Sequence, residues 1–157
     1  MTTITLKAIG TVQGGRADPV DDDWMRETAC IQLDESDFTA EALQGLDDFS
    51  HAEVIFHFNK VPADKITTDA RHPRGNKDWP KVGIFAQRGK NRPNLMAVSV
   101  CEVVKVDGTK LYVRGLDAID GTPVLDIKPV MTGFQPQSEI REPQWAKEIM
   151  AEYWEKA

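Results

Sequence analysis

Hydrophobic and polar residues alternate along much of this chain with a period of two, which is typical of β-strands. The pattern predicts strands over 3–12 and 26–33, and a longer one over 49–61, which is rich in aromatic and β-branched residues. In the last of these it assigns His51, Glu53, Ile55, His57 and Asn59 to one face, and Ala52, Val54, Phe56 and Phe58 to the other.

The segment 82–130 organises the rest of the chain. It holds an apolar run that ends in Arg88, a polar loop over 89–94, a long β-rich run and a last strand that ends at Lys128 and Pro129. An Asp107-Gly108 pair between β-branched residues predicts a hairpin with a type I′ turn, whose central residues need positive φ. We expect the loops to carry the chemistry and the strands to hold them in place.

Two segments favour helix. Residues 37–46 fit a short helix with Asp37 or Ser36 as N-cap and Gly45 near its end. After Pro143, helical spacing places five apolar residues in one stripe, suited to core packing or to a dimer contact: Trp145, Ile149, Met150, Tyr153 and Trp154. The fold class predicted is mainly β, a small antiparallel β-barrel with a short helix and a C-terminal helix.

Composition fits one globular domain. Of the 157 residues, 41% are hydrophobic and 28% are charged, values ordinary for soluble domains. The apolar runs are far shorter than the roughly 20 residues of a membrane span, and no secretory signal is visible, so we expect no membrane association and a cytoplasmic location. The formal net charge of −6 argues against wholesale non-specific nucleic-acid binding, but it permits a local basic patch.

Several residues can be interpreted either as structural or as functional. Cys30 and Cys101 form no CxxC pair, and His51 and His57 are too far apart along a strand to share a metal, so we expect no metal site. Trp24 follows a polar loop of about a dozen residues, and it either stacks on a planar ligand or caps the core. The basic stretch 71–81 beside Trp79 suits an RNA backbone, or it is a solvated loop.

The ordered motifs resemble the TsaA-like proteins, which include S-adenosylmethionine-dependent methyltransferases that act on threonylcarbamoyladenosine beside the tRNA anticodon. The resemblance rests on FAQRGKNRPN and LDAIDGTPVLDIKP, together with IGTV, LQGLDDFSHAEVIFHFNKV and HPRG, so it covers roughly residues 4–130. It implies a TsaA-like barrel domain over 1–135, with residues 136–157 as a helical extension packed on the same domain. No GxGxxG follows a strand, so a Rossmann-type site is not supported.

The resemblance also implies S-adenosyl-L-methionine as cofactor, tRNA as substrate and a homodimer. It assigns donor contacts to Asn59, Lys60, Arg88, Val98, Asp117, Ala118, Ile119 and Asp120, with Trp24 aligned only loosely. Asn91, Arg92 and Asn94 are candidates for positioning the reactants. Leu95-Met96-Ala97 replaces the more usual Pro-Ile-Gly of the family.

The residue types suit methyl transfer from a sulfonium, which requires orientation and exclusion of water more than a strong acid or base. Asp117 and Asp120 can accept from an ammonium, Arg88 can bind a carboxylate, and Phe85 or Val98 can line an apolar slot. Alternatively, Arg92 and Asp120 have a structural role and form an ion pair that holds their loops in place.

RNA contacts are expected at Arg71, Arg74, Lys77, Lys90 and Arg92. Two other functions stay open: methylation of another substrate, and a non-catalytic module that binds a nucleoside or RNA.

Overall fold

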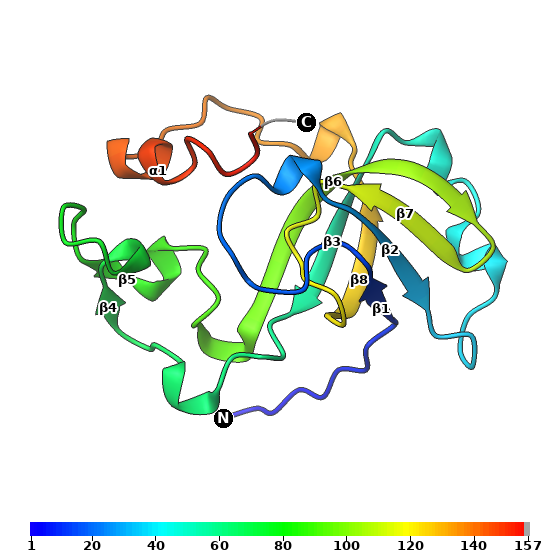
Figure 1. Cartoon of the computed structure of the whole chain (residues 1–157), viewed down its shortest axis with the longest axis horizontal. Coiled ribbons are helices and arrows are strands. Elements are labelled where there is room, and N and C mark those ends of the chain that lie inside the picture. The colour runs from blue at the N-terminus through cyan, green and yellow to red at the C-terminus, as the bar shows by residue number, and fades with distance from the viewer. Residues whose placement is uncertain (156–157) are drawn as a thin grey trace.

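A computed structural model describes residues 1–155. Six strands close into an antiparallel barrel in the order β1-β2-β7-β6-β3-β8, and a separate two-stranded ladder, β4-β5, lies to one side of it (Figure 1). The elements are β1 (Gly10–Gln13), β2 (Thr28–Leu33), β3 (His51–His57), β4 (Ala70–Arg71), β5 (Val82–Gly83), β6 (Met96–Asp107), β7 (Lys110–Arg114), β8 (Pro123–Pro129) and the helix α1 (Gln144–Ile149). None of the helices in residues 1–155 is long and apolar enough to cross a bilayer.

The barrel interior is filled by the inward-facing residues of every strand. In β3, Ala52, Val54 and Phe56 are buried while their neighbours are partly exposed, which confirms the predicted alternation. The largest fully buried side chains of the barrel strands are Val12, Ile31, Val54, Phe56, Leu111, Val113 and Val124. Burial of such side chains is the main stabilising contribution to a small domain, at about 25 cal/mol per Å² of apolar surface.

The hairpin between β6 and β7 forms where the sequence predicts it, but its turn is one residue further along. Asp107 pairs with Lys110, so Gly108 and Thr109 are the central residues. Only Gly108 has positive φ, at 62°. This pattern fits a type II′ turn, in which glycine occupies the first central position, rather than the predicted type I′.

The predicted first strand over 3–12 is wrong in extent, since β1 begins only at Gly10. Its neighbour β2 ends at Leu33, so residues further back have no strand beside them on that side. Ile4 and Leu6 are accordingly 75% and 58% exposed. Periodicity alone could not show where the partner strand stops.

Both predicted helices are shorter than expected. Residues 37–46 contain a 3-10 turn over Ala40–Leu43, capped by Thr39 without a side-chain bond, and Gly45, with a left-handed φ of 85°, separates it from a second 3-10 turn over Leu46–Asp48. The predicted caps Asp37 and Ser36 are therefore wrong. After Pro143 the α-helix covers only Gln144–Ile149, and turns follow it.

Candidate functional site

Three connections leave the barrel from the same end. In the antiparallel pairs, Gln13 lies opposite Cys30 and His57 lies opposite Met96, so the end of β1 adjoins the start of β2 and the end of β3 adjoins the start of β6. The start of β8 joins them, because Val124 lies opposite Phe56. The connections 14–27, 58–95 and 115–122 thus share what we call the loop end of the barrel. Every residue predicted to contact the methyl donor lies at this end, either in one of these connections or, for Val98, near the start of β6.

Asp117 has an unusual environment in the connection 115–122. Its Oδ2 accepts a hydrogen bond from the Tyr153 hydroxyl, whereas Oδ1 is buried without a hydrogen-bond partner among residues 1–155. Its negative charge is also felt by the Cys101 thiol, whose pKa is raised to about 12 by burial first and by Asp117 second. A buried carboxylate oxygen without a partner is costly, so it indicates a place for a donor or a cation.

The neighbours of Asp117 are built into the scaffold. Ala118 and Ile119 are buried, at 4% and 9% exposure, so their side chains belong to the core and only their backbone groups can reach a ligand. The Thr122 hydroxyl donates to the Ile119 carbonyl at 2.7 Å and closes the turn. The connection therefore holds Asp117 on a rigid base.

Asp120 joins two of the connections. Its Oδ1 accepts from the backbone N–H of Gly14 at 2.8 Å, and its own N–H donates to the Arg16 carbonyl at 2.8 Å. Arg92 instead donates to the Gln87 carbonyl at 2.6 Å, within its own loop. The two residues each pin a loop, but residues 1–155 contain no ion pair between Arg92 and Asp120. The ion-pair alternative is therefore wrong.

Arg88 and Val98 lie together. The Arg88 Nη2 donates to the Val98 carbonyl at 2.9 Å, and Arg88 is exposed, so its guanidinium retains donors that face solvent. Val98 belongs to a row of outward-facing apolar residues on β6 that includes Met96 and Val100, with exposed fractions of 37–42%. Phe85 is 79% exposed nearby in sequence. A cationic hydrogen-bond donor and apolar surface therefore lie together at Arg88 and Val98.

The positioning candidates Asn91, Arg92 and Asn94 lie where the connection 58–95 returns to β6, and the donor candidates Asn59 and Lys60 lie where it leaves β3. Phe58, the residue before Asn59 and Lys60, donates its N–H to the Leu95 carbonyl at 2.8 Å. The Asn91 carbonyl accepts from the Thr67 N–H at 3.0 Å. Asn94 and Leu95 both have positive φ, at 62° and 52°. Two consecutive non-glycine residues in this region are strained, and strain of this kind concentrates at functional loops.

Trp24 caps the core rather than facing solvent. It is 4% exposed, and the Arg16 guanidinium lies 3.9 Å from its ring centroid. Arg16 also donates to the Val20 carbonyl at 2.6 Å, and its Nε lies 3.0 Å from a Glu27 oxygen. Sequence analysis missed Arg16, because nothing in a glycine-rich loop indicated that one arginine would organise it.

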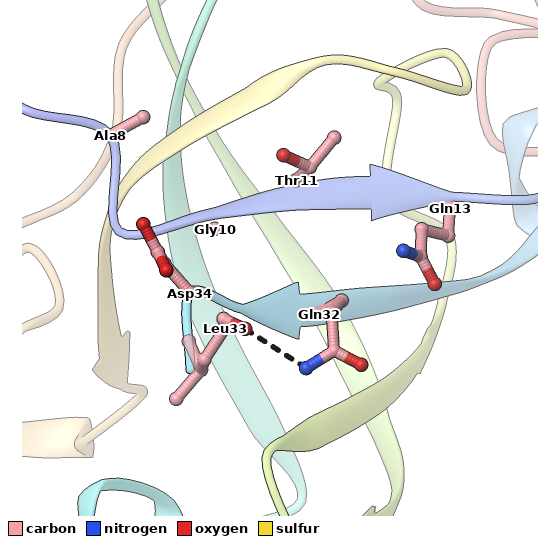
Figure 2. Close-up of a pocket in the computed structure, with 7 residues that line it drawn as sticks. All are labelled: Ala8, Gly10, Thr11, Gln13, Gln32, Leu33 and Asp34. Carbon is pink, nitrogen blue, oxygen red and sulfur yellow. Dashed lines mark hydrogen bonds between the residues drawn. The ribbon is translucent and has the colours of Figure 1, made fainter. Parts of the chain in front are cut away.

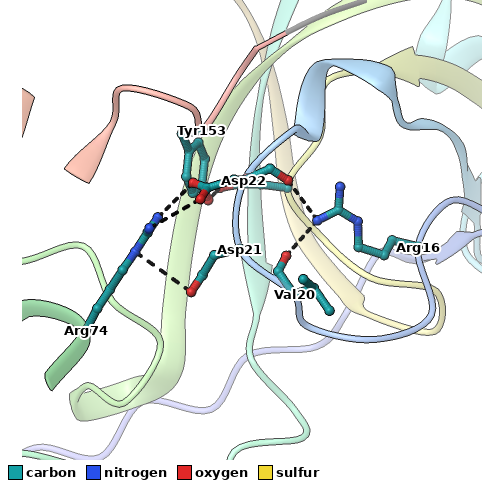
Figure 3. A network of polar contacts seen from close by, with 7 residues as sticks. Arg16, Val20, Asp21, Asp22, Arg74 and Tyr153 are labelled. Carbon is teal, nitrogen blue, oxygen red and sulfur yellow. Dashed lines mark hydrogen bonds and ion pairs between the residues drawn. The ribbon is translucent and has the colours of Figure 1, made fainter. Parts of the chain in front are cut away.

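The basic residues divide into two groups. The Gln87 side chain donates to the Arg71 carbonyl at 3.0 Å, so the strand that carries Arg71 is fastened to the loop of Lys90 and Arg92. Arg74 is neutralised by the acidic loop, with its Nη2 3.1 Å from Asp22 and its Nε 3.8 Å from Asp21 (Figure 3). Lys77 and Lys90 are exposed and form no ion pair with another residue of 1–155.

Tyr153 is the main residue that sequence analysis did not connect with the site. The sequence pattern places it only in an apolar stripe, and it lies 36 residues from the Asp117 that it contacts. Burial first, and the Asp117 carboxylate second, raise the pKa of its hydroxyl far above the ordinary value, so the hydroxyl is a neutral donor.

A further hollow and the acidic and histidine side chains of residues 1–155 do not form a second candidate site. A shallow hollow of about 230 Å³ lies over β1 and β2, where the Gln32 side chain folds back onto the Leu33 carbonyl (Figure 2). Its only ionisable lining residue is Asp34, which accepts from Ser36 in an ordinary turn. No cluster of three His, Cys, Asp or Glu side chains within residues 1–155 could hold a metal ion.

Comparison with known proteins identifies relatives of most of the chain. The family described as the tRNA-methyltransferase O N-terminal domain matches residues 16–135. The tRNA (adenine(37)-N6)-methyltransferase of Mus musculus is 36% identical over 113 residues, which are 70% of this chain and 26% of the mouse protein. A Pseudomonas aeruginosa protein named as an S-adenosylmethionine-dependent methyltransferase, RcsF, is 42% identical over 104 residues, 65% of this chain and 40% of its own.

Solved structures agree with these relatives. A crystal structure of TrmO from Pseudomonas aeruginosa matches with a TM-score of 0.73 and 25% identity, over 92% of this chain and 62% of that one. The fold class predicted from sequence is confirmed by this likeness. The chain spans about a quarter of the mouse relative and less than two thirds of the TrmO chain.

Proposed function

Because the chain belongs to the tRNA-methyltransferase O N-terminal domain family, we propose that it transfers a methyl group from S-adenosylmethionine to N6 of threonylcarbamoyladenosine in tRNA, at the adenine next to the anticodon. The observation that carries the proposal is the buried, unpartnered Oδ1 of Asp117 at the loop end of the barrel. The ammonium of a methionine moiety would satisfy this oxygen with a charge-assisted hydrogen bond.

The neighbouring residues suit the rest of the donor. Arg88, anchored on the Val98 carbonyl, has donors left for the methionine carboxylate. Val98 and the exposed Phe85 offer apolar surface for adenine. Asn59, Lys60 and Asp120, with the backbone groups of Ala118 and Ile119, complete the proposed contact set. Trp24 contributes indirectly, by holding the connection 14–27 through Arg16.

The protein's part in the reaction is orientation. The donor supplies an activated methyl group, and the adenine N6 displaces its sulfur as the new N–C bond forms and the N6 proton is released to solvent. The strained loop of Asn91, Arg92 and Asn94 would hold the adenine in line with the methyl group. Arg92 is itself fixed by its bond to the Gln87 carbonyl, so it can position a ligand precisely.

The tRNA contact is proposed at the basic residues of the two fastened loops: Arg71, Arg74, Lys77, Lys90 and Arg92. The chain is acidic overall, so phosphate recognition depends on such a concentrated patch. A cytoplasmic location follows from a tRNA substrate.

We also propose a homodimer. The row Met96, Val98 and Val100 exposes apolar side chains on an outer barrel face, and the Trp154 side of the 144–155 segment offers a second apolar surface. Sedimentation velocity should find a species of about twice 17.6 kDa at micromolar protein. A Val100→Lys variant that remains folded should sediment as a monomer if the β6 row is the interface. A wild-type monomer would reject the dimer.

The decisive experiment uses labelled S-adenosylmethionine and tRNA from a strain that lacks the corresponding activity. After incubation, the tRNA is digested to nucleosides, and the label should appear in N6-methylated threonylcarbamoyladenosine. Asp117→Asn should reduce the label strongly, whereas Asp126→Asn, a matched change on β8, should not. Label in another nucleoside would change the substrate. Donor binding without any label in tRNA would favour methylation of another substrate or a non-catalytic module, which the Leu95-Met96-Ala97 replacement also allows.

A further inference from the structure

The 144–155 segment returns to the loop end of the barrel, although it lies outside the residues that match the family. The backbone N–H groups of Asp23 and Trp24 donate to the carbonyls of Glu152 and Tyr153 at 3.0 and 2.9 Å. These bonds bring the Tyr153 hydroxyl onto Asp117. One segment from far along the chain thus closes over the residue that we propose to bind the donor's ammonium.

In this arrangement the Asp117 carboxylate is not available to a ligand. Tyr153 occupies Oδ2, and Oδ1 is buried without contact to solvent. The ammonium of a donor could engage both oxygens of the carboxylate only if the Tyr153 hydroxyl left Oδ2. In this conformation the proposed donor site is therefore closed at Asp117.

The segment buries little surface against the barrel. Its helix α1 has six residues, and Trp154 remains 36% exposed. Besides the bond to Asp117, it is anchored by the Trp79 indole N–H, which donates to Glu148 at 2.7 Å on the surface. The connection 14–27 that it pairs with is held by Arg74 on one side and by Arg16 on the opposite side (Figure 3). A segment with little buried surface can open at low cost while its base stays in place.

We propose that the 144–155 segment is a strap over the methyl-donor site, and that the donor's ammonium, in binding the Asp117 carboxylate at Oδ1, displaces the Tyr153 hydroxyl from Oδ2. The proposal rests on the function proposed above. A neutral phenol gives a weaker hydrogen bond to a carboxylate than an ammonium does, so donor binding can displace Tyr153. Empty protein keeps Asp117 covered, and only a ligand with a cationic amine opens it.

Amide hydrogen exchange tests the strap in the unaltered protein. On saturation with S-adenosylmethionine, the amides of Asp23 and Trp24 should exchange faster, because they lose Glu152 and Tyr153 as acceptors. The Leu33 amide, which donates to Thr109 at 3.0 Å at the other end of the barrel, is the control and should not become faster. Donor binding with Asp23 and Trp24 still protected would overturn the strap while leaving the proposed function intact.

A single-atom variant tests the competition. Tyr153→Phe removes the hydroxyl and should tighten S-adenosylmethionine binding by about ten- to a hundredfold, the range that corresponds to one hydrogen bond to a charged group. Tyr112→Phe, the same change on the outer side of β7, should leave the affinity unchanged. Melting curves would establish that both variants are folded. Equal or weaker binding by folded Tyr153→Phe would overturn the proposal.

The two hypotheses fail in different ways. If neither the wild type nor Tyr153→Phe bound the donor in calorimetry, the donor site itself would be refuted, and the strap with it. If Tyr153→Phe bound and the wild type did not, both would be supported, with the strap stronger than we infer.

Discussion

Asp117 and Asp120 lie three residues apart in one connection, but their partners give them different roles. Asp120 accepts the Gly14 N–H and so fastens the connection 14–27 to the barrel. Asp117 shares one oxygen with Tyr153 and keeps the other buried without a partner. Because an unsatisfied buried acceptor costs about 1–3 kcal/mol, Asp117 is the residue that gains most from a ligand.

The role of Arg88 can be tested at the same scale. Arg88→Ala should leave the donor carboxylate without its charged partner and weaken S-adenosylmethionine binding by about 1.5–3 kcal/mol. Calorimetry measures the change directly. Arg141→Ala removes the same charge from an exposed residue that belongs to none of the three connections of the loop end, and it should have no effect. Unchanged affinity in Arg88→Ala would remove this residue from the site.

These residue roles were only partly accessible from sequence. The two aspartates and Arg88 could be selected because carboxylates and a guanidinium in loops suit an amino-acid moiety. Their different environments could not be predicted, since they depend on Gly14 and Tyr153, which lie 106 and 36 residues away. Arg16 was missed although its side-chain partners are close in sequence, because nothing in its glycine-rich loop indicated that one arginine would organise it.

At the scale of elements, β1 and β2 approach each other unusually closely at Gly10. A Cβ built on Gly10 would lie 2.3 Å from the Gln32 carbonyl oxygen and 3.1 Å from the Leu33 Cα. Both are backbone atoms of the neighbouring strand, so they cannot move aside as a flexible side chain would. Glycine is required here by contact with the partner strand and not by its own φ.

Gly10→Ala should therefore destabilise the barrel by about 1–3 kcal/mol or more, the usual cost of overpacking. Chemical denaturation gives the free energy of unfolding. Gly133→Ala is the matched control, because no atom lies within 4 Å of the Cβ it would add. Equal stability of the two variants would show that β1 and β2 can separate without cost.

The elements that sequence predicted best are those whose pattern is set by the barrel itself. The alternation in β3 is visible because its inner face is buried and its outer face is not. Residues 3–9 have a similar pattern, but β2 ends at Leu33 and leaves them without a strand on that side. This error arises from the extent of another segment, which a local pattern does not contain. Residues 37–46 form a 3-10 turn over Ala40–Leu43 where the pattern predicts a longer helix.

At the scale of the whole molecule, opposite charges from distant segments meet at the loop end. Arg74 is paired with Asp21 and Asp22, 53 and 52 positions earlier in the chain. Its charge is therefore largely compensated before any nucleic acid approaches, and a phosphate would have to replace two carboxylates. Lys77 and Lys90 are exposed and form no ion pair within residues 1–155, so a phosphate could bind them without displacing a carboxylate.

Because Arg74 is already paired, the exposed lysines Lys77 and Lys90 should contribute more to tRNA binding than Arg74 does. Lys77→Ala combined with Lys90→Ala should weaken tRNA binding and lower the slope of log affinity against log salt by about 0.7–0.9 for each phosphate that the variant no longer neutralises. Arg74→Ala should change both quantities less, because Asp21 and Asp22 already neutralise that guanidinium. Lys105→Ala with Lys128→Ala changes the net charge equally, on β6 and β8, and separates a local contact from a general effect of charge. The affinity for S-adenosylmethionine should stay the same in both lysine double variants, whose substituted residues lie outside the proposed donor contacts. If the Lys77 and Lys90 pair behaved like the control pair, tRNA would bind another face, and the basic loops would be ordinary solvated surface.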